Sequence, residues 1–404
     1  MSRYKRPSRG RGQSRSFQNR GRGRNPRSFR GGGRRSRSFD PTFLINQSSS
    51  KHQAKIEVVK IDNEFTDFPL DERVKANVKT KGYITPTPIQ DQTIPLILKN
   101  KDVVGIANTG TGKTAAFLIP LINKLYKNRD EKVLIITPTR ELAGQIQEEF
   151  VSLARGLRMY SALCIGGVSM GQQIRQLRQN PEFVIGTPGR LKDLEQRRIL
   201  NLRVFTTIVL DEVDRMLDMG FIHDMKHIIS FLPQKRHSLF FSATIEGKVR
   251  EVMNQFLQNP TIVSVKTGQT TENVDQKIVR LAGKNKIEVL HNLLIQEGFD
   301  KVLVFGRTKW GMEKLSKALL DKGFKATSIH GNKSQNQRQR ALRRFKNGEV
   351  NILLATDVAQ RGLDIDNVSH VINFDLPETQ DDYIHRIGRT ARADKKGIAI
   401  TLMP

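Results

Sequence analysis

The chain has 404 residues, enough for two globular domains and an additional segment. Its 68 lysines and arginines against 40 acidic residues give a net charge of +28, which favours nucleic acid first and an anionic membrane surface second as partner. Its apolar runs are too short to span a bilayer and none follows the charged N-terminus, so we expect no membrane span and no secretory signal. The single cysteine, Cys164, excludes an internal disulfide and a cysteine-based zinc cluster, and it fits a reducing, cytoplasmic location.

Residues 1–40 are rich in Arg, Gly and Ser. Between Met1 and Phe39 the sequence has 13 arginines, one lysine and no acidic residue, and the triplet RSF occurs three times. Such a segment cannot bury enough apolar area to offset its chain entropy, so we predict a disordered tail. Arginine pairs with phosphates and stacks on bases, as phenylalanine does, and we therefore favour RNA contact over the alternative of a purely solubilising tail.

Residues 41–60 are predicted to be a linker, followed by two α/β domains at 61–265 and 275–404 that are joined by the polar stretch 266–274. Short β-rich runs such as DVVGIA, KVLIITP and TTIVLDE alternate with helical patterns in the first domain, and KVLVFGRT and NILLATD do so in the second. This alternation predicts a parallel sheet covered by helices in each domain.

A phosphate-binding loop is predicted where the run GIANTGTGKTAA joins a strand to a helix. It matches the pattern G-x-x-x-x-G-K-[ST], with Ala107 at the first position in place of glycine. The glycines let backbone N–H groups surround phosphate oxygens, Lys113 is predicted to reach the β- and γ-phosphates, and the Thr114 hydroxyl is predicted to bind magnesium. A chance turn is the alternative, which the strand–loop–helix context disfavours. The predicted loop residues are Thr109, Gly110, Thr111, Gly112, Lys113 and Thr114.

Three carboxylates, Asp211, Glu212 and Asp214, follow the apolar run TTIVL. Alone they are explained by a solvated strand-to-helix turn, because acids favour helix N-termini. Beside a phosphate-binding loop, however, an acid that ends a neighbouring strand holds magnesium, so Asp211 is the predicted second ligand, partly through water. Glu212 is then placed to orient and deprotonate a water that attacks the γ-phosphate.

Together these motifs resemble those of the DEAD-box RNA helicases. DEVD at 211–214 is similar to the D-E-A-D signature, with Val213 in place of alanine, and further motifs follow in the family's order from Phe65 to Arg392. The resemblance implies two tandem RecA-like domains and an RNA-stimulated ATPase that remodels single-stranded and short duplex RNA with ATP and magnesium. Two alternatives stay open: an ATP-dependent RNA clamp with poor turnover, and a DNA translocase of related fold.

The resemblance also assigns the remaining ATP contacts. In GYITPTPIQ, Gln90 is expected to read the adenine edge and Phe65 to stack on its face, with Phe68 as a competing candidate. Ser242 and Thr244 of the SAT motif are expected to couple hydrolysis to strand separation. In the second domain the expected catalytic residues are Gln335, His385 and the arginine fingers Arg389 and Arg392, and the expected ATP contacts are Gly362 and Asp364. Without the family, the run HRIGRTAR would be a basic helix facing solvent; Ala391 stands where the family usually has glycine.

The expected RNA contacts are six residues of the first domain and three of the second. Such residues hold the phosphates and ribose hydroxyls and do not read bases, so binding should be independent of sequence; turn chemistry and surface charge are the alternatives. Ribosomal or RNA-decay proteins are the partners that the resemblance allows, no membrane is expected, and the oligomeric state is not readable. The nine residues are Pro138, Arg140, Gly166, Gly167, Thr187, Arg190, Arg307, Gly331 and Thr356.

Overall fold

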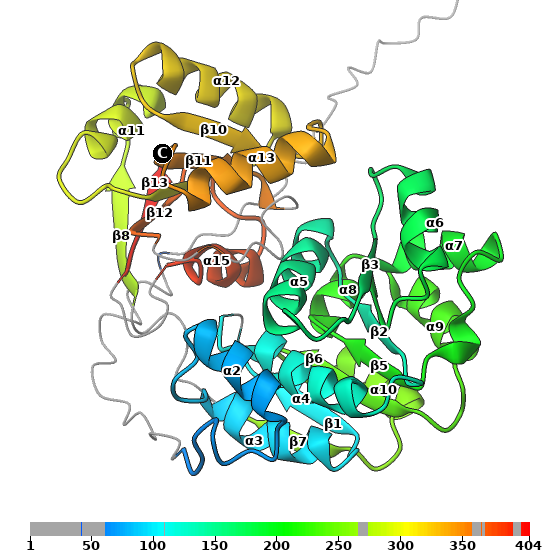
Figure 1. Ribbon diagram of the computed structural model, residues 1–404. Helices are drawn as coiled ribbons and strands as arrows, with labels where there is room; N and C mark the ends of the chain where they lie inside the picture. The colour runs from blue at the N-terminus through cyan, green and yellow to red at the C-terminus, as the bar shows by residue number, and fades with distance from the viewer. Residues whose placement is uncertain are drawn as a thin grey trace, which may run out of the picture. The chain divides into compact units, whose positions relative to one another are not determined.

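The computed structural model describes Thr42 and residues 61–108, 110–265, 274–357, 365, 368–390 and 397–404. The predicted tail at 1–40, the predicted linker at 41–60 apart from Thr42, and residues 266–273 lie outside the described residues. The described part contains two parallel sheets, each with helices on both faces (Figure 1), which confirms the predicted α/β class.

The first sheet has seven parallel strands in the order β3-β4-β2-β5-β6-β1-β7. All but the edge strand β7 are largely buried, as short apolar strands between two layers of helices must be. The strands are β1 (Val103–Ile106), β2 (Val133–Ile136), β3 (Ser161–Cys164), β4 (Phe183–Gly186), β5 (Thr207–Leu210), β6 (His237–Ser242) and β7 (Thr261–Ser264).

Two separate apolar cores cover the two faces of this sheet. The first four helices pack on one core, and the later helices pack on the other. The first group is α2 (Glu72–Thr80), α3 (Pro88–Leu98), α4 (Lys113–Lys127) and α5 (Arg140–Leu153). The second group is α6 (Met170–Arg178), α7 (Pro188–Gln196), α8 (Val213–Asp218), α9 (Ile222–Ser230) and α10 (Lys248–Phe256), with a 3₁₀ turn at Leu202–Val204.

The second sheet has six parallel strands in the order β10-β11-β9-β12-β13-β8. They are β8 (Val274–Arg280), β9 (Val302–Phe305), β10 (Ala326–Ile329), β11 (Ile352–Ala355), β12 (His370–Asn373) and β13 (Gly397–Met403). The first, β8, begins at Val274, the last residue of the segment expected as a linker.

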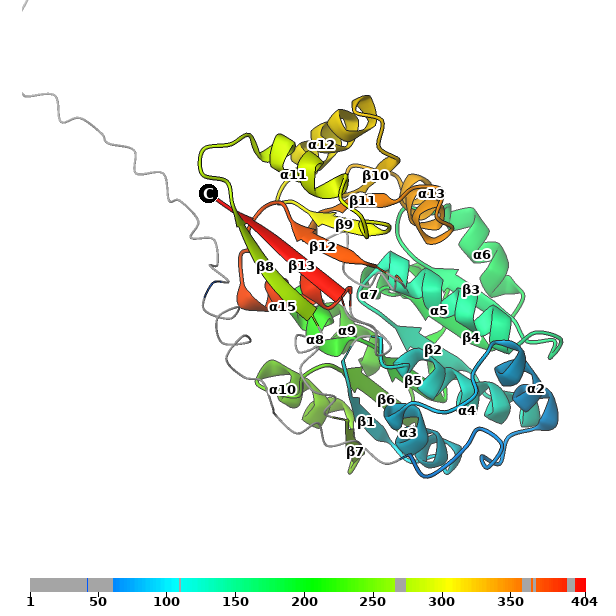
Figure 2. The ribbon, with the colours of Figure 1, turned by 90° about the vertical axis from the view of Figure 1, so that its left-hand side faces the viewer.

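Four described helices cover the second sheet. α11 (Lys286–Leu294) and α12 (Lys309–Asp321) pack on one face (Figure 2), and α13 (Gln335–Lys346) and α15 (Gln380–Ile387) pack on the other. Within the described residues, none of the helices in either domain has the length and apolar character needed to cross a membrane.

Parallel pairing brings the carboxyl ends of the central strands to one edge of the first sheet. Ile106 at the end of β1 pairs with Ser242 at the end of β6, and β5 and β6 pair in register beside them. The close packing requires glycine at position 105, because a Cβ there would lie 2.5 Å from the ring of Phe241. In parallel α/β sheets this edge is where ligands bind, so the motifs that follow these strands lie where a site is expected.

Candidate active site

The loop between β1 and α4 has the backbone that phosphate binding requires. Gly110 and Gly112 adopt the left-handed region, with φ of +84° and +91°. A Cβ on Gly112 would also collide with the side-chain amide of Gln90. Glycine at 112 is therefore imposed twice, by the backbone angle and by the close approach of Gln90.

Lys113 begins α4 and turns back over this loop. Its side chain is buried, and Nζ donates a hydrogen bond of 2.6 Å to the carbonyl of Ala107, at the first position of the motif. A phosphate oxygen would be a stronger acceptor than a neutral carbonyl, because both partners are then charged. Thr111 donates to the carbonyl of Asn108 at 2.8 Å, whereas Thr109 lies outside the described residues.

Gln90 connects the start of α3 to the phosphate-binding loop. Its Oε1 accepts the backbone N–H of Thr87 at 2.9 Å, and its Nε2 donates to the carbonyl of Gly112 at 3.1 Å. A primary amide has two acceptor lone pairs and two N–H donors. Gln90 therefore still has one lone pair on Oε1 and one N–H on Nε2 with which to bind an adenine edge. Phe65 and Phe68 are both buried, with ring centroids 5.9 Å apart, and the choice between them for adenine stacking stays open.

Asp211 directly follows β5 and is almost completely buried, with 2% of its surface exposed. Burial raises the pKa of its carboxyl group from 3.8 to about 7; Lys113 opposes this shift, whereas Glu212 and Asp214 add to it. A buried carboxyl group with such a pKa is unfavourable as an anion unless a cation lies beside it. Asp211 and the Thr114 hydroxyl carry oxygen donors of the kind that magnesium takes, and both residues follow strands that end at the same edge of the sheet. Their chemistry therefore fits that ion.

Glu212 has an unusual backbone for a residue that is not glycine. Its φ is +52°, and it caps the N-terminus of α8. Its carboxylate is buried, and Oε2 lies 3.6 Å from Nε of Arg215 with no hydrogen-bond donor among the described residues. A strained backbone that holds a buried carboxylate is typical of active sites, since the surrounding fold must impose it.

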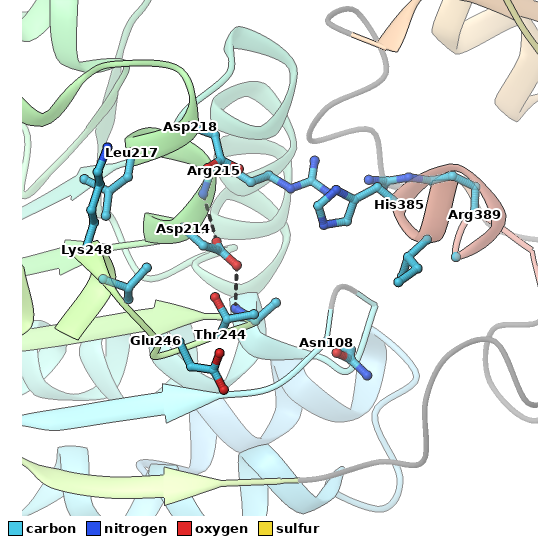
Figure 3. Close-up of a pocket in the computed structure, with 14 residues that line it drawn as sticks. Asn108, Asp214, Arg215, Leu217, Asp218, Thr244, Glu246, Lys248, His385 and Arg389 are labelled. Atoms are coloured by element: carbon cyan, nitrogen blue, oxygen red, sulfur yellow. Dashed lines mark hydrogen bonds between the residues drawn. The ribbon is translucent and has the colours of Figure 1, made fainter. Parts of the chain in front are cut away.

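Asp214 links the acidic turn to the SAT motif, a role that the sequence analysis did not assign. Its Oδ2 accepts the backbone N–H of Ala243 at 3.0 Å, and its Oδ1 accepts that of Arg215 at 3.0 Å (Figure 3). Ser242 is buried, Thr244 is exposed, and the link runs through the Ala243 backbone rather than through either hydroxyl. Asp214 is the last acid of the DEVD signature, and this position was the signal from which its role could have been predicted.

Asp214 and the SAT residue Thr244 line a cavity of about 670 Å³ (Figure 3), whereas Lys113, Asp211 and Glu212 are not among its lining residues. Side chains that follow β1, β5 and β6 contribute to its wall, and so do residues at the end of α15. The lining residues are Asn108, Asp214, Arg215, Leu217, Asp218, Ala243, Thr244, Glu246, Lys248, Val249, Ile384, His385, Gly388 and Arg389.

The predicted catalytic residues of the second domain are described in part. α15 ends at Ile387, so Arg389 follows the helix in a turn and does not continue a helical face, although it is 2% exposed. The side chain of Gln335, at the start of α13, donates to Glu141 at 3.0 Å, and Arg338 pairs with the same carboxylate at 3.1 Å. Gly362, Asp364, Ala391 and Arg392 lie outside the described residues.

Among the described residues of the second domain, Arg386 is the most completely buried charge, with 0% of its surface exposed. Its guanidinium group binds both carboxylate oxygens of Asp357 at 2.6 and 2.7 Å, the side-chain oxygen of Asn373 at 3.2 Å and the carbonyl of Asp375 at 2.6 Å. The side chain therefore fastens α15 to the segments that follow β11 and β12.

Replacing Arg386 by alanine is expected to destabilise the second domain by about 3–5 kcal/mol, because Asp357 would lose its buried partner. Thermal unfolding of the purified chain measures this loss. Arg340→Ala, which removes an exposed arginine from α13, is the matched control and should change stability by less than about 0.5 kcal/mol. Equal melting of the two variants would contradict the structural role of Arg386.

The predicted RNA contacts of the first domain follow the carboxyl ends of three adjacent strands, β3, β4 and β2. Arg140 begins α5 after Pro138, and its guanidinium group lies against the turn that follows β3: Cβ atoms on Gly166 and Gly167 would meet it at 2.8 and 2.5 Å. Thr187 caps α7 after β4, and Arg190 lies in the first turn of that helix.

The second domain repeats this arrangement. Arg307, Gly331 and Thr356 follow β9, β10 and β11, which are also adjacent in their sheet. Arg307 and Gly331 are exposed, and the backbone N–H of Arg307 donates to Asp375 at 2.9 Å. In each domain the fold thus brings the three predicted RNA-contacting segments to one edge of the sheet.

Comparison with known proteins places the chain among helicases. The DEAD/DEAH box helicase family matches residues 87–252, and the helicase conserved C-terminal domain matches residues 285–394. The ATP-dependent RNA helicase CshA of Listeria monocytogenes is 44% identical over 342 residues, which are 84% of this chain and 66% of that protein. The DEAD-box ATP-dependent RNA helicase CshA of Bacillus licheniformis is 45% identical over 341 residues, 84% of this chain and 70% of that protein. The chain thus spans about two thirds of the length of these relatives.

Solved structures show the same pair of domains. Dbp5 of Saccharomyces cerevisiae bound to RNA and ADP BeF3 has a TM-score of 0.75 and 29% identity, covering 85% of this chain and 90% of that one. A DEAD box protein from Methanococcus jannaschii has a TM-score of 0.51 and 39% identity, covering 84% and 93% of the two chains. These similarities confirm the predicted tandem RecA-like domains.

Proposed function

The chain belongs to the DEAD-box family of ATP-dependent RNA helicases, and we propose that it binds RNA irrespective of sequence and locally unwinds it in cycles of RNA-stimulated ATP hydrolysis. The observation that carries this proposal is the common position of the motifs. The phosphate-binding loop, the acidic turn and the predicted RNA-contacting segments of the first domain all follow the carboxyl ends of strands in one parallel sheet.

In the proposed reaction, Lys113 exchanges the Ala107 carbonyl for phosphate oxygens, and Gln90 uses its remaining donor and acceptor for adenine. Glu212 accepts a proton from the attacking water as the water oxygen bonds to the γ-phosphorus and the bond to the leaving ADP oxygen breaks. Arg389 and Arg392 stabilise the negative charge that develops on the transferred phosphoryl group.

We propose magnesium as the cofactor, held by Asp211 and Thr114. The ion supplies positive charge beside the phosphate oxygens. The burial of Asp211 supports this assignment, because a neighbouring cation makes its ionised form favourable.

RNA is proposed to run across the segments that follow β2, β3 and β4 of the first domain and β9, β10 and β11 of the second. The positive tail at 1–40 is proposed to add contacts without sequence preference. We propose a cytoplasmic location, and we propose ribosomal or RNA-decay proteins as partners, in line with an RNA-remodelling activity.

The proposal is tested by measuring ATP hydrolysis with no nucleic acid, with single-stranded RNA and with single-stranded DNA of the same sequence. RNA is expected to raise the rate strongly, and DNA is expected to have little effect, since the proposed contacts include ribose 2′-hydroxyls. Equal stimulation by DNA would instead indicate a DNA translocase. Tight joint binding of ATP and RNA without turnover would identify a clamp.

A further inference from the structure

Trp310, in the first turn of α12, is the only tryptophan of the chain. It is 72% exposed, the second-highest value among the exposed large hydrophobic side chains of the described residues. Burying a tryptophan side chain is strongly favourable, so a tryptophan that stays exposed to water commonly marks a binding surface.

The same face of α12 lies against the loop that follows β10. Glu313, one turn after Trp310, accepts the Ser328 hydroxyl at 2.6 Å, and its Oε2 lies 2.9 Å from Nε2 of His330 and 3.4 Å from Nζ of Lys333. Helical residues three apart share a face, and their side chains lean toward the N-terminus of the helix. Trp310 therefore lies on the face that borders Gly331, displaced toward Arg307.

The surroundings of Trp310 are cationic rather than apolar. Arg307, Lys309 and Lys314 are all exposed. Of the two nearby acids, Glu313 is paired with Lys333 and Asp375 with Lys286. The other exposed large hydrophobic side chain of α12 in the described chain is Leu320, near the far end of the helix. A docking site for a protein would expose a contiguous apolar patch, whereas an isolated aromatic ring among cations is typical of single-stranded nucleic-acid binding.

We propose that Trp310 stacks on a base of single-stranded RNA, within a surface formed by Arg307, Lys309, Trp310, Gly331 and Lys333. The inference rests on the proposed function, in which Arg307 and Gly331 contact the RNA backbone, and it adds a base contact to that path. The ring supplies a flat apolar face that any base can cover, while the neighbouring cations hold the adjoining phosphates. A Cβ built at Gly331 would meet no atom within 4 Å, so the backbone there is open to a strand.

Because Trp310 is the only tryptophan, the intrinsic fluorescence of the unmodified chain tests the proposal directly. Single-stranded RNA, added with a non-hydrolysable ATP analogue, is expected to quench the indole emission and to shield it from acrylamide. Binding is followed in parallel by the anisotropy of a labelled RNA.

Substitution gives the second measurement. Trp310→Ala is expected to weaken RNA binding about 5- to 30-fold, with an unchanged dependence on salt because no phosphate contact is removed. Trp310→Phe should retain most of the affinity, since its ring still stacks. Leu320→Ala, an exposed apolar residue of the same helix, is the matched control and should bind RNA as the wild type does.

Unchanged emission at RNA concentrations that saturate the anisotropy would overturn the proposal, as would wild-type affinity in Trp310→Ala; the exposed ring would then be assigned to a protein partner. These results would leave the proposed function intact. If the wild type did not bind RNA, both the stacking contact and the proposed function would be overturned. The anisotropy of the labelled RNA shows whether the wild type binds, and so it distinguishes this outcome from failure of the stacking contact alone.

Discussion

Replacing Arg389 by alanine is expected to slow RNA-stimulated ATP hydrolysis by a factor of about 10³–10⁵. The proposed role of this side chain is to neutralise charge that appears on the phosphoryl group only in the transition state, so its loss should lower kcat far more than ATP affinity. The position of Arg389 fits this role, because the residue follows α15 and lines the cavity of Figure 3. The measurement is kcat at saturating RNA, with ATP affinity determined from a fluorescent analogue.

Arg386→Ala and Arg389→Lys are the informative comparisons for this prediction. The first should lower the melting temperature, because the bonds of Arg386 to Asp357 hold the domain together. Arg389 is itself 2% exposed, so kcat is compared per folded enzyme in every variant. Arg389→Lys keeps a positive charge but loses the planar fork, so it should recover only part of the rate. A wild-type kcat in Arg389→Ala would remove this residue from the catalytic assignment.

Replacing Glu212 by glutamine is expected to reduce the rate of hydrolysis by about 10²–10⁴ while ATP and RNA still bind. The amide has nearly the same shape as the carboxylate, but it cannot accept the proton of the attacking water. Since the left-handed backbone at 212 is set by the turn between β5 and α8, the substitution should not alter the fold. Single-turnover hydrolysis isolates the chemical step from product release.

Glu251→Gln serves as the control for this substitution, because it neutralises an exposed carboxylate on α10 in the same domain. It should hydrolyse ATP at the wild-type rate. If Glu212→Gln also stayed within about tenfold of the wild type, another group would have to activate the water, since the loss of a general base costs more than that.

The local motifs could be predicted from the sequence because their physical causes are local. The runs VVGI, VLII and TIVL are strands because both faces are buried, and the glycines of the phosphate-binding loop are needed for its positive φ angles. The order of the motifs then predicted which strand ends would meet, because parallel strands share one carboxyl edge.

The pairing of polar side chains could not be predicted, because it joins residues far apart in the sequence. Asp214 meets the backbone of Ala243, 29 residues later, and Arg386 meets Asp357 across an equal separation. In each case many acids and donors are compatible by type, and only the packing of the strands selects one pair. The run HRIGRTAR also differs from a continuous helix, because α15 ends before Arg389. Packing is again the cause: the chain turns back toward the segment before β12, where Thr390 donates to the carbonyl of Val368.

The strand order of the second domain has a consequence for synthesis on the ribosome. β8 opens this domain in the sequence, yet it pairs with β13, which is made more than a hundred residues later. The first sheet can be completed once β7 has emerged, whereas β8 has no partner in its sheet until residues 397–403 leave the exit tunnel. The two domains therefore differ in when their sheets can form: the first once β7 has emerged, and the second only once β13 has emerged.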